Sequence, residues 1–121
     1  MLKSFIALAL LAGTVSAAQA ADAAAGATVF KRCTVCHTNA KGAGNGLGPN
    51  LFGVFGRKAA SLKDFPYSGA LQKSGLVWTE DNLTKWVAGP GRMVPGTKMI
   101  FPGLASKTQQ ANVVAYLKSL K

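Results

Sequence analysis

The sequence is poor in acidic residues, in histidine and in cysteine. Its 121 residues include four Asp and Glu against fourteen Lys and Arg, which gives a formal net charge of +10. There is one histidine, His37, and there are two cysteines, Cys33 and Cys36. These three residues fall short of the four ligands that a structural zinc site normally takes. The positive charge favours partners with acidic surfaces, or an anionic membrane surface.

Runs of basic residues are also missing. The Lys and Arg side chains of the main part of the chain are spread from Lys31 to Lys121 and form no dense cluster. This distribution, in a chain with the features of an exported protein described next, argues against nucleic acid as a partner.

The N-terminus lacks an apolar run long enough for a membrane span, which needs about 20 residues. It has instead a short basic start ending at Lys3, an apolar stretch over 5–15, and the small residues Ala18-Gln19-Ala20. This is the pattern of a secretory signal. We expect residues 1–20 to be a signal peptide cleaved near Ala20, with a retained anchor as the alternative. Residues 21–121 then form one periplasmic domain.

The most informative motif is Cys33-Thr34-Val35-Cys36-His37. Two thiols separated by two residues and followed directly by an imidazole can attach a haem covalently and supply its first iron ligand, His37. Three other interpretations compete. A disulfide would close a very small loop and stabilise little. A thioredoxin-like dithiol expects alternating strands and helices, and zinc expects a fourth ligand.

The rest of the chain predicts an all-α class with about four helices and long loops. Asp22 is a plausible cap for a first helix running to about Cys36, and Gly26 within it favours a close helix crossing. Residues 68–74, a segment capped by Thr79 and ended by Gly89-Pro90, and residues 108–120 are the other expected helices. Residues 41–56, with six glycines and Pro49, and residues 91–106 are expected loops. In the last helix we expect a buried stripe at Val113, Tyr116, Leu117 and Leu120.

A second axial ligand cannot be another imidazole, because His37 is the only one. After signal removal the candidate thioethers are Met93 and Met99, and either could equally be a core methionine. Met99 follows Pro95-Gly96, which favours a turn that brings this loop over the second haem face.

Several further motifs occur in a characteristic order. They are Gly48-Pro49-Asn50-Leu51-Phe52-Gly53, Gly56-Arg57-Lys58, Phe65-Pro66-Tyr67-Ser68, Trp78, Pro95-Gly-Thr-Lys-Met99-Ile-Phe101 and Ala115-Tyr116-Leu117. With the Cys33–His37 motif, they make the chain resemble the class I cytochrome c family, of the small bacterial periplasmic type similar to mitochondrial cytochrome c. The resemblance covers nearly all of residues 21–121.

The resemblance implies a small cytochrome c fold wrapped around one haem c, held covalently through Cys33 and Cys36. It implies His37 and Met99 as iron ligands and the Pro49 carbonyl as acceptor of the His37 ring N–H. Arg57, Tyr67 and Trp78 are then expected near the haem propionates. The chain departs from the mitochondrial pattern at Trp86, where a Tyr is usual, and at Leu71, where an Asn is usual.

The function implied is a monomeric, soluble one-electron carrier that is not an enzyme. Its expected partners are redox proteins with acidic docking surfaces: a cytochrome bc complex, a terminal oxidase, a photosynthetic reaction centre or a dehydrogenase. Two alternatives stay open. One is a haem subunit dedicated to a single periplasmic dehydrogenase, and the other is a haem enzyme with a labile sixth ligand.

Overall fold

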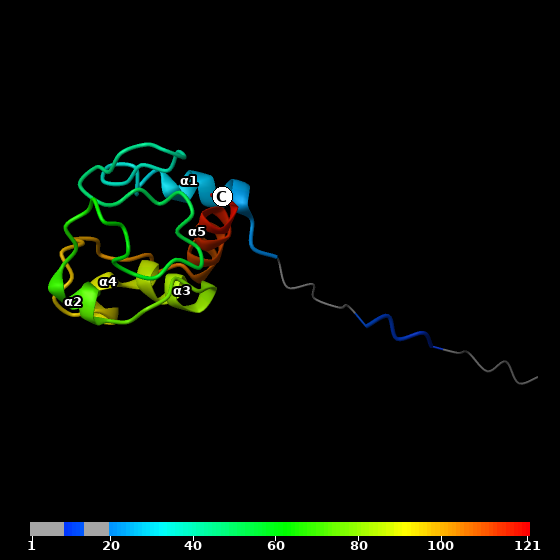
Figure 1. Ribbon diagram of the computed structural model, residues 1–121. Helices are drawn as coiled ribbons and strands as arrows, with labels where there is room; N and C mark the ends of the chain where they lie inside the picture. The colour runs from blue at the N-terminus through cyan, green and yellow to red at the C-terminus, as the bar shows by residue number, and fades with distance from the viewer. Residues whose placement is uncertain (1–8, 14–19) are drawn as a thin grey trace, which may run out of the picture.

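The computed structural model describes residues 9–13 and 20–121. Its helices are α1 (Ala23–Phe30), α2 (Gly69–Lys73), α3 (Glu80–Ala88), α4 (Pro90–Met93) and α5 (Lys107–Ser119) (Figure 1). Loops join them, except that only Gly89 separates α3 from α4. The described residues form no strand, and only an isolated bridge pairs Lys58 with Val77. The predicted all-α class is confirmed, with five helices rather than four.

The expected signal peptide, residues 1–20, falls mostly outside the described residues, so its cleavage near Ala20 stays a prediction. In the part of the chain that the structure describes, no helix has the length and apolar character needed to cross a membrane.

Four helices begin where a polar side chain caps free backbone N–H groups, as the sequence predicted for the caps at Asp22 and Thr79. Asp22 accepts hydrogen bonds from the N–H groups of Ala24 and Ala25 at the start of α1. The corresponding caps of α2, α3 and α5 are Ser68, Thr79 and Ser106. The starts of these helices are therefore determined by the local sequence.

Two helix boundaries differ from expectation. Helix α1 ends at Phe30 rather than near Cys36, and tight turns follow, in which the Cys33 N–H donates to the Phe30 carbonyl at 2.7 Å. The Thr34 hydroxyl donates to the Lys31 carbonyl at 2.8 Å, and such side-chain bonds compete with helix continuation. Helix α4 was expected to be loop, but Pro90 is well suited to a first helical position because its missing N–H is not needed there.

Helices α1 and α5 lie side by side and cross at Gly26 (Figure 1). A Cβ at Gly26 would collide with the Asn112 carbonyl and with the Tyr116 side chain. Phe30 is buried one turn further on, with its ring 4.9 Å from that of Tyr116. The predicted close crossing is confirmed, and it requires glycine at position 26.

The core draws on loops as well as helices. Helix α5 buries Val113, Val114 and Leu117, so the predicted stripe is correct at two positions, while Tyr116 and Leu120 are only partly buried. The remaining core side chains come from α1, α2, α3 and the loops: Phe30, Val54, Ala59, Leu71, Trp78, Leu83, Trp86, Val87, Val94 and Leu104. Five of these lie outside helices, so the long loops are packed parts of the structure.

Candidate functional site

The two cysteines lie in the turns that follow α1. Cys33 and Cys36 are free thiols, both partly buried, and the His37 N–H donates to the Cys33 carbonyl at 2.9 Å. Burial raises the pKa of the Cys33 thiol, and the neighbouring Arg32 charge opposes that effect. The turn therefore presents two neighbouring thiols directly beside the imidazole.

The His37 ring is oriented by a backbone carbonyl. Its Nδ1 donates to the Pro49 oxygen at 2.7 Å, so the proton of the neutral ring is on Nδ1 and the Nε2 lone pair is left free. Burial lowers the pKa of His37, while the hydrogen bond to Pro49 opposes the change. A neutral imidazole with a fixed tautomer is the form that binds a metal.

Gly48 packs directly against the His37 ring. It is buried, and a Cβ at this position would overlap the His37 ring. Its N–H donates to the Cys36 carbonyl at 2.8 Å, which ties the glycine loop to the cysteine turn. The sequence indicated Pro49 through the family resemblance, but the need for glycine under the ring appears only in the structure.

Arg57 and Trp78 are brought together by backbone pairing. The Trp78 N–H donates to the Arg57 carbonyl at 2.9 Å, beside the bridge between Lys58 and Val77. The Arg57 guanidinium is half-buried and donates to the carbonyls of Asn50, at 3.1 Å, and Phe52, at 3.4 Å. Burial lowers the pKa of Arg57, and nearby Tyr67 opposes this.

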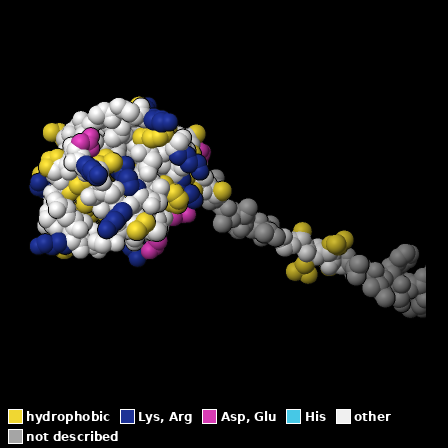
Figure 2. Space-filling view, viewed as in Figure 1, with side chains coloured by type: hydrophobic (Ala, Val, Ile, Leu, Met, Phe, Trp, Pro, Cys, Tyr) yellow, Lys and Arg dark blue, Asp and Glu magenta, His cyan; other side chains and the backbone are white. Residues whose placement is uncertain are grey.

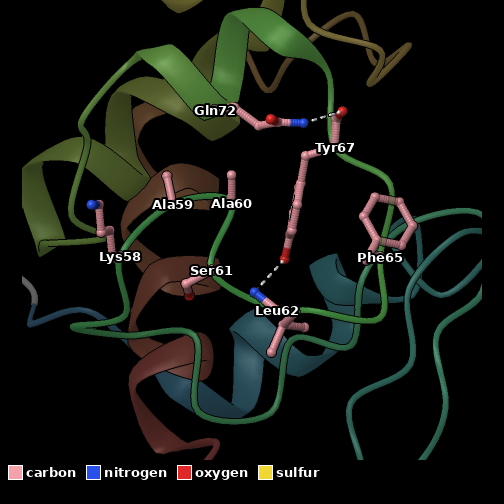
Figure 3. Close-up of a pocket in the computed structure, with 8 residues that line it drawn as sticks. All are labelled: Lys58, Ala59, Ala60, Ser61, Leu62, Phe65, Tyr67 and Gln72. Carbon is pink, nitrogen blue, oxygen red and sulfur yellow. Dashed lines mark hydrogen bonds between the residues drawn. The ribbon is translucent and has the colours of Figure 1, made fainter.

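Tyr67 forms one wall of a hollow of about 520 Å³ (Figure 3). Its hydroxyl accepts from the Leu62 N–H at 3.4 Å, and its carbonyl accepts from the Gln72 side chain at 3.0 Å. The ring hydroxyl is thus held by the loop that contains Arg57, and the backbone of Tyr67 is held by Gln72 of α2. The structure places three predicted residues, Arg57, Tyr67 and Trp78, in one region.

Met99 lies in a loop between α4 and α5. It is partly buried against the core, and its N–H makes a long 3.4 Å hydrogen bond to the Thr97 hydroxyl. Lys98 reaches across to the Pro66 carbonyl, also at 3.4 Å, so this loop lies next to the segment that carries Tyr67. The other candidate, Met93, lines a separate hollow of about 360 Å³ with Ala70, Lys73, Ser74, Leu76, Val94 and Pro95.

Two tryptophans pack in the interior near these segments. The rings of Trp78 and Trp86 meet edge to face, with centroids 5.1 Å apart, and both side chains are buried. Trp86 is the residue that departs from the mitochondrial pattern. Leu71, the other departure, is also a core residue, so both substitutions are absorbed by apolar packing.

The alternative interpretations of the cysteine motif gain no support from the structure. No disulfide joins Cys33 and Cys36. Across residues 9–13 and 20–121, no three His, Cys, Asp or Glu side chains are grouped so that they could hold a metal ion by themselves. The segment also lacks the strands that a thioredoxin-like site requires, since the described chain contains only helices and loops.

Fold and site together define a small helical protein built around a covalent haem-attachment motif. The family model described as "Cytochrome c" matches residues 23–121. Cytochrome c2 of Blastochloris viridis is 42% identical over 118 residues, which cover 98% of this chain and 93% of that protein. Cytochrome c2 of Rhodoblastus acidophilus is 45% identical over 102 residues, covering 84% of this chain and 95% of that protein.

Among solved structures, cytochrome cH from Methylobacterium extorquens aligns with a TM-score of 0.77 at 44% identity, covering 81% of this chain and 98% of that chain. The chain therefore belongs to the cytochrome c family. It carries one covalently attached haem c and serves as an electron carrier. This confirms the family, the fold and the general function expected from the sequence.

Proposed function

We propose that His37 and Met99 are the two axial ligands of the haem iron, with the haem attached through Cys33 and Cys36. The observation that carries the proposal is the 2.7 Å hydrogen bond from His37 Nδ1 to the Pro49 carbonyl. It fixes the ring orientation and leaves Nε2 as the free ligand atom. When bound, the haem supplies an iron that takes up and releases one electron.

The surroundings of Arg57 indicate that an anion binds nearby and that this anion is not an acidic side chain of the protein. The guanidinium is half-buried, yet its hydrogen bonds go only to two carbonyl oxygens. Three of the four acidic side chains are engaged elsewhere, with Asp22 capping α1, Asp81 paired with Lys85, and Glu80 paired with Lys118. A haem propionate is the counter-ion that would satisfy Arg57, because a partly buried cation needs a charged partner.

The two indole N–H groups point to the same conclusion. Every fully buried side-chain nitrogen or oxygen in the described residues has a hydrogen-bond partner. Hydrogen bonds within that part of the chain leave the indole N–H groups of Trp78 and Trp86 without an acceptor, so these two nitrogen atoms are not fully buried and can be reached from outside the protein, although the rest of each side chain is buried. With Tyr67, the Trp78 N–H is a suitable propionate donor.

Met99 is favoured over Met93 as the second ligand. Met93 ends α4 and lines a hollow formed with α2, whereas Met99 follows the turn at Gly96, where φ is 90°. A methionine on the iron would leave no open position for oxygen or peroxide. This argues for a carrier and against the alternative of a haem enzyme with a labile sixth ligand.

The protein is proposed to act in the periplasm as a monomer that passes electrons between partners with acidic docking surfaces. The net charge of +10 and the wide spread of Lys and Arg over the visible face support this (Figure 2). Such a surface speeds encounter with an acidic partner. A cytochrome bc complex, a terminal oxidase, a reaction centre or a dehydrogenase would each fit that description.

Absorption spectra of the purified protein in both redox states test the ligand set. We expect a c-type ferrous spectrum and the weak ferric methionine–iron band. Absence of that band in the wild type, or its survival in Met99→Leu, would remove Met99 as ligand. Mass spectrometry of the exported protein tests cleavage after Ala20, and stable co-purification with one dehydrogenase would favour the dedicated-subunit alternative.

A further inference from the structure

Asn50 uses all of its polar groups in hydrogen bonds within the glycine-rich loop. Its side-chain Nδ2 donates to the carbonyls of Ala40, at 2.9 Å, and Ala43, at 2.7 Å. Its Oδ1 accepts from the Phe52 N–H at 2.9 Å. One side chain therefore joins the segment just after His37 to the segment just after Pro49.

The backbone of Asn50 is fixed as well. Its N–H donates to Asn45 Oδ1 at 2.8 Å, and its carbonyl accepts from Arg57 Nη2 at 3.1 Å. The two side-chain donor bonds, the side-chain acceptor bond and the two backbone bonds reach both flanks of the loop. Asn50 therefore takes part in five hydrogen bonds, each with a different residue.

This anchoring acts directly on the carbonyl that holds His37. The Pro49 carbonyl and the Asn50 N–H belong to the same planar peptide unit, and this peptide is trans. In a trans unit the two groups point in opposite directions, so the bond from the N–H to Asn45 helps to aim the carbonyl at His37 Nδ1. The three side-chain bonds of Asn50 hold the Asn50 end of the same peptide unit in place. Rotation of that plane would lengthen the 2.7 Å bond.

We propose that Asn50 is the positioning residue for the His37 imidazole, acting through the Pro49 carbonyl. The proposal rests on the proposed function, in which His37 is an iron ligand. The side chain at this position makes two donor hydrogen bonds and one acceptor hydrogen bond, which an asparagine amide can provide. Aspartate has no donor, and alanine has neither donor nor acceptor.

The lone histidine makes a direct test possible, because protein labelled with ¹⁵N-histidine gives one ring. In the reduced holoprotein, the exchange rate of the His37 Nδ1 proton with solvent is measured by NMR. This rate is divided by the exchange rate of the Val113 amide in the core. A general loss of stability raises both rates and therefore leaves their ratio unchanged. We expect Asn50→Ala to raise this ratio by about tenfold, since the peptide unit loses its three side-chain anchors and is then held only by the backbone bonds to Asn45 and Arg57.

Asn82→Ala is the matched control, because Asn82 donates one side-chain bond to the Val77 carbonyl at 2.8 Å, away from His37. Its ratio should stay within about twofold of the wild type. Asn50→Asp keeps the acceptor for the Phe52 N–H. It is the second test variant if the alanine variant does not accumulate as folded holoprotein. It should also raise the ratio, because both Nδ2 donors are lost.

An unchanged ratio in the Asn50 variants, or a rise matched by Asn82→Ala, would overturn the proposal. Failure of both Asn50 variants to fold while Asn82→Ala folds normally would overturn it too, since that indicates a folding role. The ligand assignment is judged separately in the wild type, where an Nε2–H signal would show that His37 does not bind iron. The Nδ1 comparison between variants holds in either case.

Discussion

The two sides of the proposed haem site are held by different means. On the His37 side, residues 36–57 are joined by short hydrogen bonds, including 2.7 Å bonds from His37 to Pro49 and from Asn50 to Ala43. On the Met99 side, residues 94–104, the bonds made by Lys98 and Met99 themselves measure 3.4 Å, and the one short side-chain bond, from Gln110 at 2.6 Å, holds the Leu104 carbonyl at the far end of the loop. The histidine is thus oriented by the protein alone, whereas the methionine depends more on packing and on its bond to iron.

Exposed apolar side chains occur on both sides, and the difference lies next to the ligands. Leu47 on the His37 side and Ile100 on the Met99 side are both strongly exposed, whereas Gly48, beside Pro49, is buried under the His37 ring. Segments whose hydrogen bonds are long open at low free-energy cost. We therefore expect the Met99 loop to open before the His37 loop does, and the predictions below test that difference.

The largest contrast is expected from removing the ligands themselves. His37→Ala should abolish accumulation of the holoprotein, because the attachment motif loses its iron ligand. Met99→Ala should still accumulate with covalent haem but lose the ferric methionine–iron band. Haem-stained gels and ferric absorption spectra make the measurement. Equal loss of holoprotein in both variants would show that the two sides are not held differently.

Stability should show the next contrast, at two glycines. Gly48→Ala places a methyl group into the His37 ring and should lower the free energy of unfolding by about 1–3 kcal/mol, as overpacking does. Gly96→Ala meets only the Ala70 Cβ at 3.3 Å, and its cost of about 1 kcal/mol comes from the positive φ of 90°. Denaturant unfolding of the holoproteins measures both changes. A larger cost at Gly96 would reverse the comparison.

The sequence predicted the parts of this site that depend on short motifs. The turn of Cys33 and Cys36 with His37, the caps at Asp22 and Thr79, and the close crossing at Gly26 follow from local spacing or local chemistry. The Pro49 contact was expected only through the family resemblance, and the structure shows its hydrogen bond. Met99 as ligand remains a proposal.

What could not be predicted depends on contacts between distant segments. The hydrogen bonds of Asn50 to Ala40 and Ala43 require the fold of the whole loop, although an asparagine after Pro49 was a usable turn signal. The edge-to-face contact of Trp78 with Trp86 forms only when a loop packs against α3. Periodicity within a single segment carries no information about such pairs.

A smaller effect is expected in electron transfer, where an exposed basic residue stands next to a haem-attachment cysteine and another next to Met99. Arg32 adjoins Cys33, and Lys98 adjoins Met99; both are exposed. Replacing either with Gln should slow transfer to an acidic partner by about threefold at low salt, because steering charge is lost. Stopped-flow rates over a range of ionic strength measure this.

The outcome also ranks the two sides as docking surfaces. A slower rate in only one variant would show that the partner approaches from that side. Rates that do not respond to salt in the wild type would contradict the proposed role of the basic surface. The conservative variants Arg32→Lys and Lys98→Arg keep the charge and serve as controls.

The smallest expected effect comes from two threonines whose hydroxyls can be removed with little change of shape. Thr38 donates to the Gly44 carbonyl on the His37 side, and Thr97 accepts from the Met99 N–H at 3.4 Å. Thr38→Val should cost about 1 kcal/mol of unfolding free energy, a usual value for one hydrogen bond. Thr97→Val should cost less than about 0.5 kcal/mol, because a bond at that length is weak.

Yet Thr97→Val should speed amide exchange of Met99 itself, since local opening of that loop already costs little. Equal costs in the two variants, with no faster exchange at Met99, would mean that the loop is held as firmly as the histidine side.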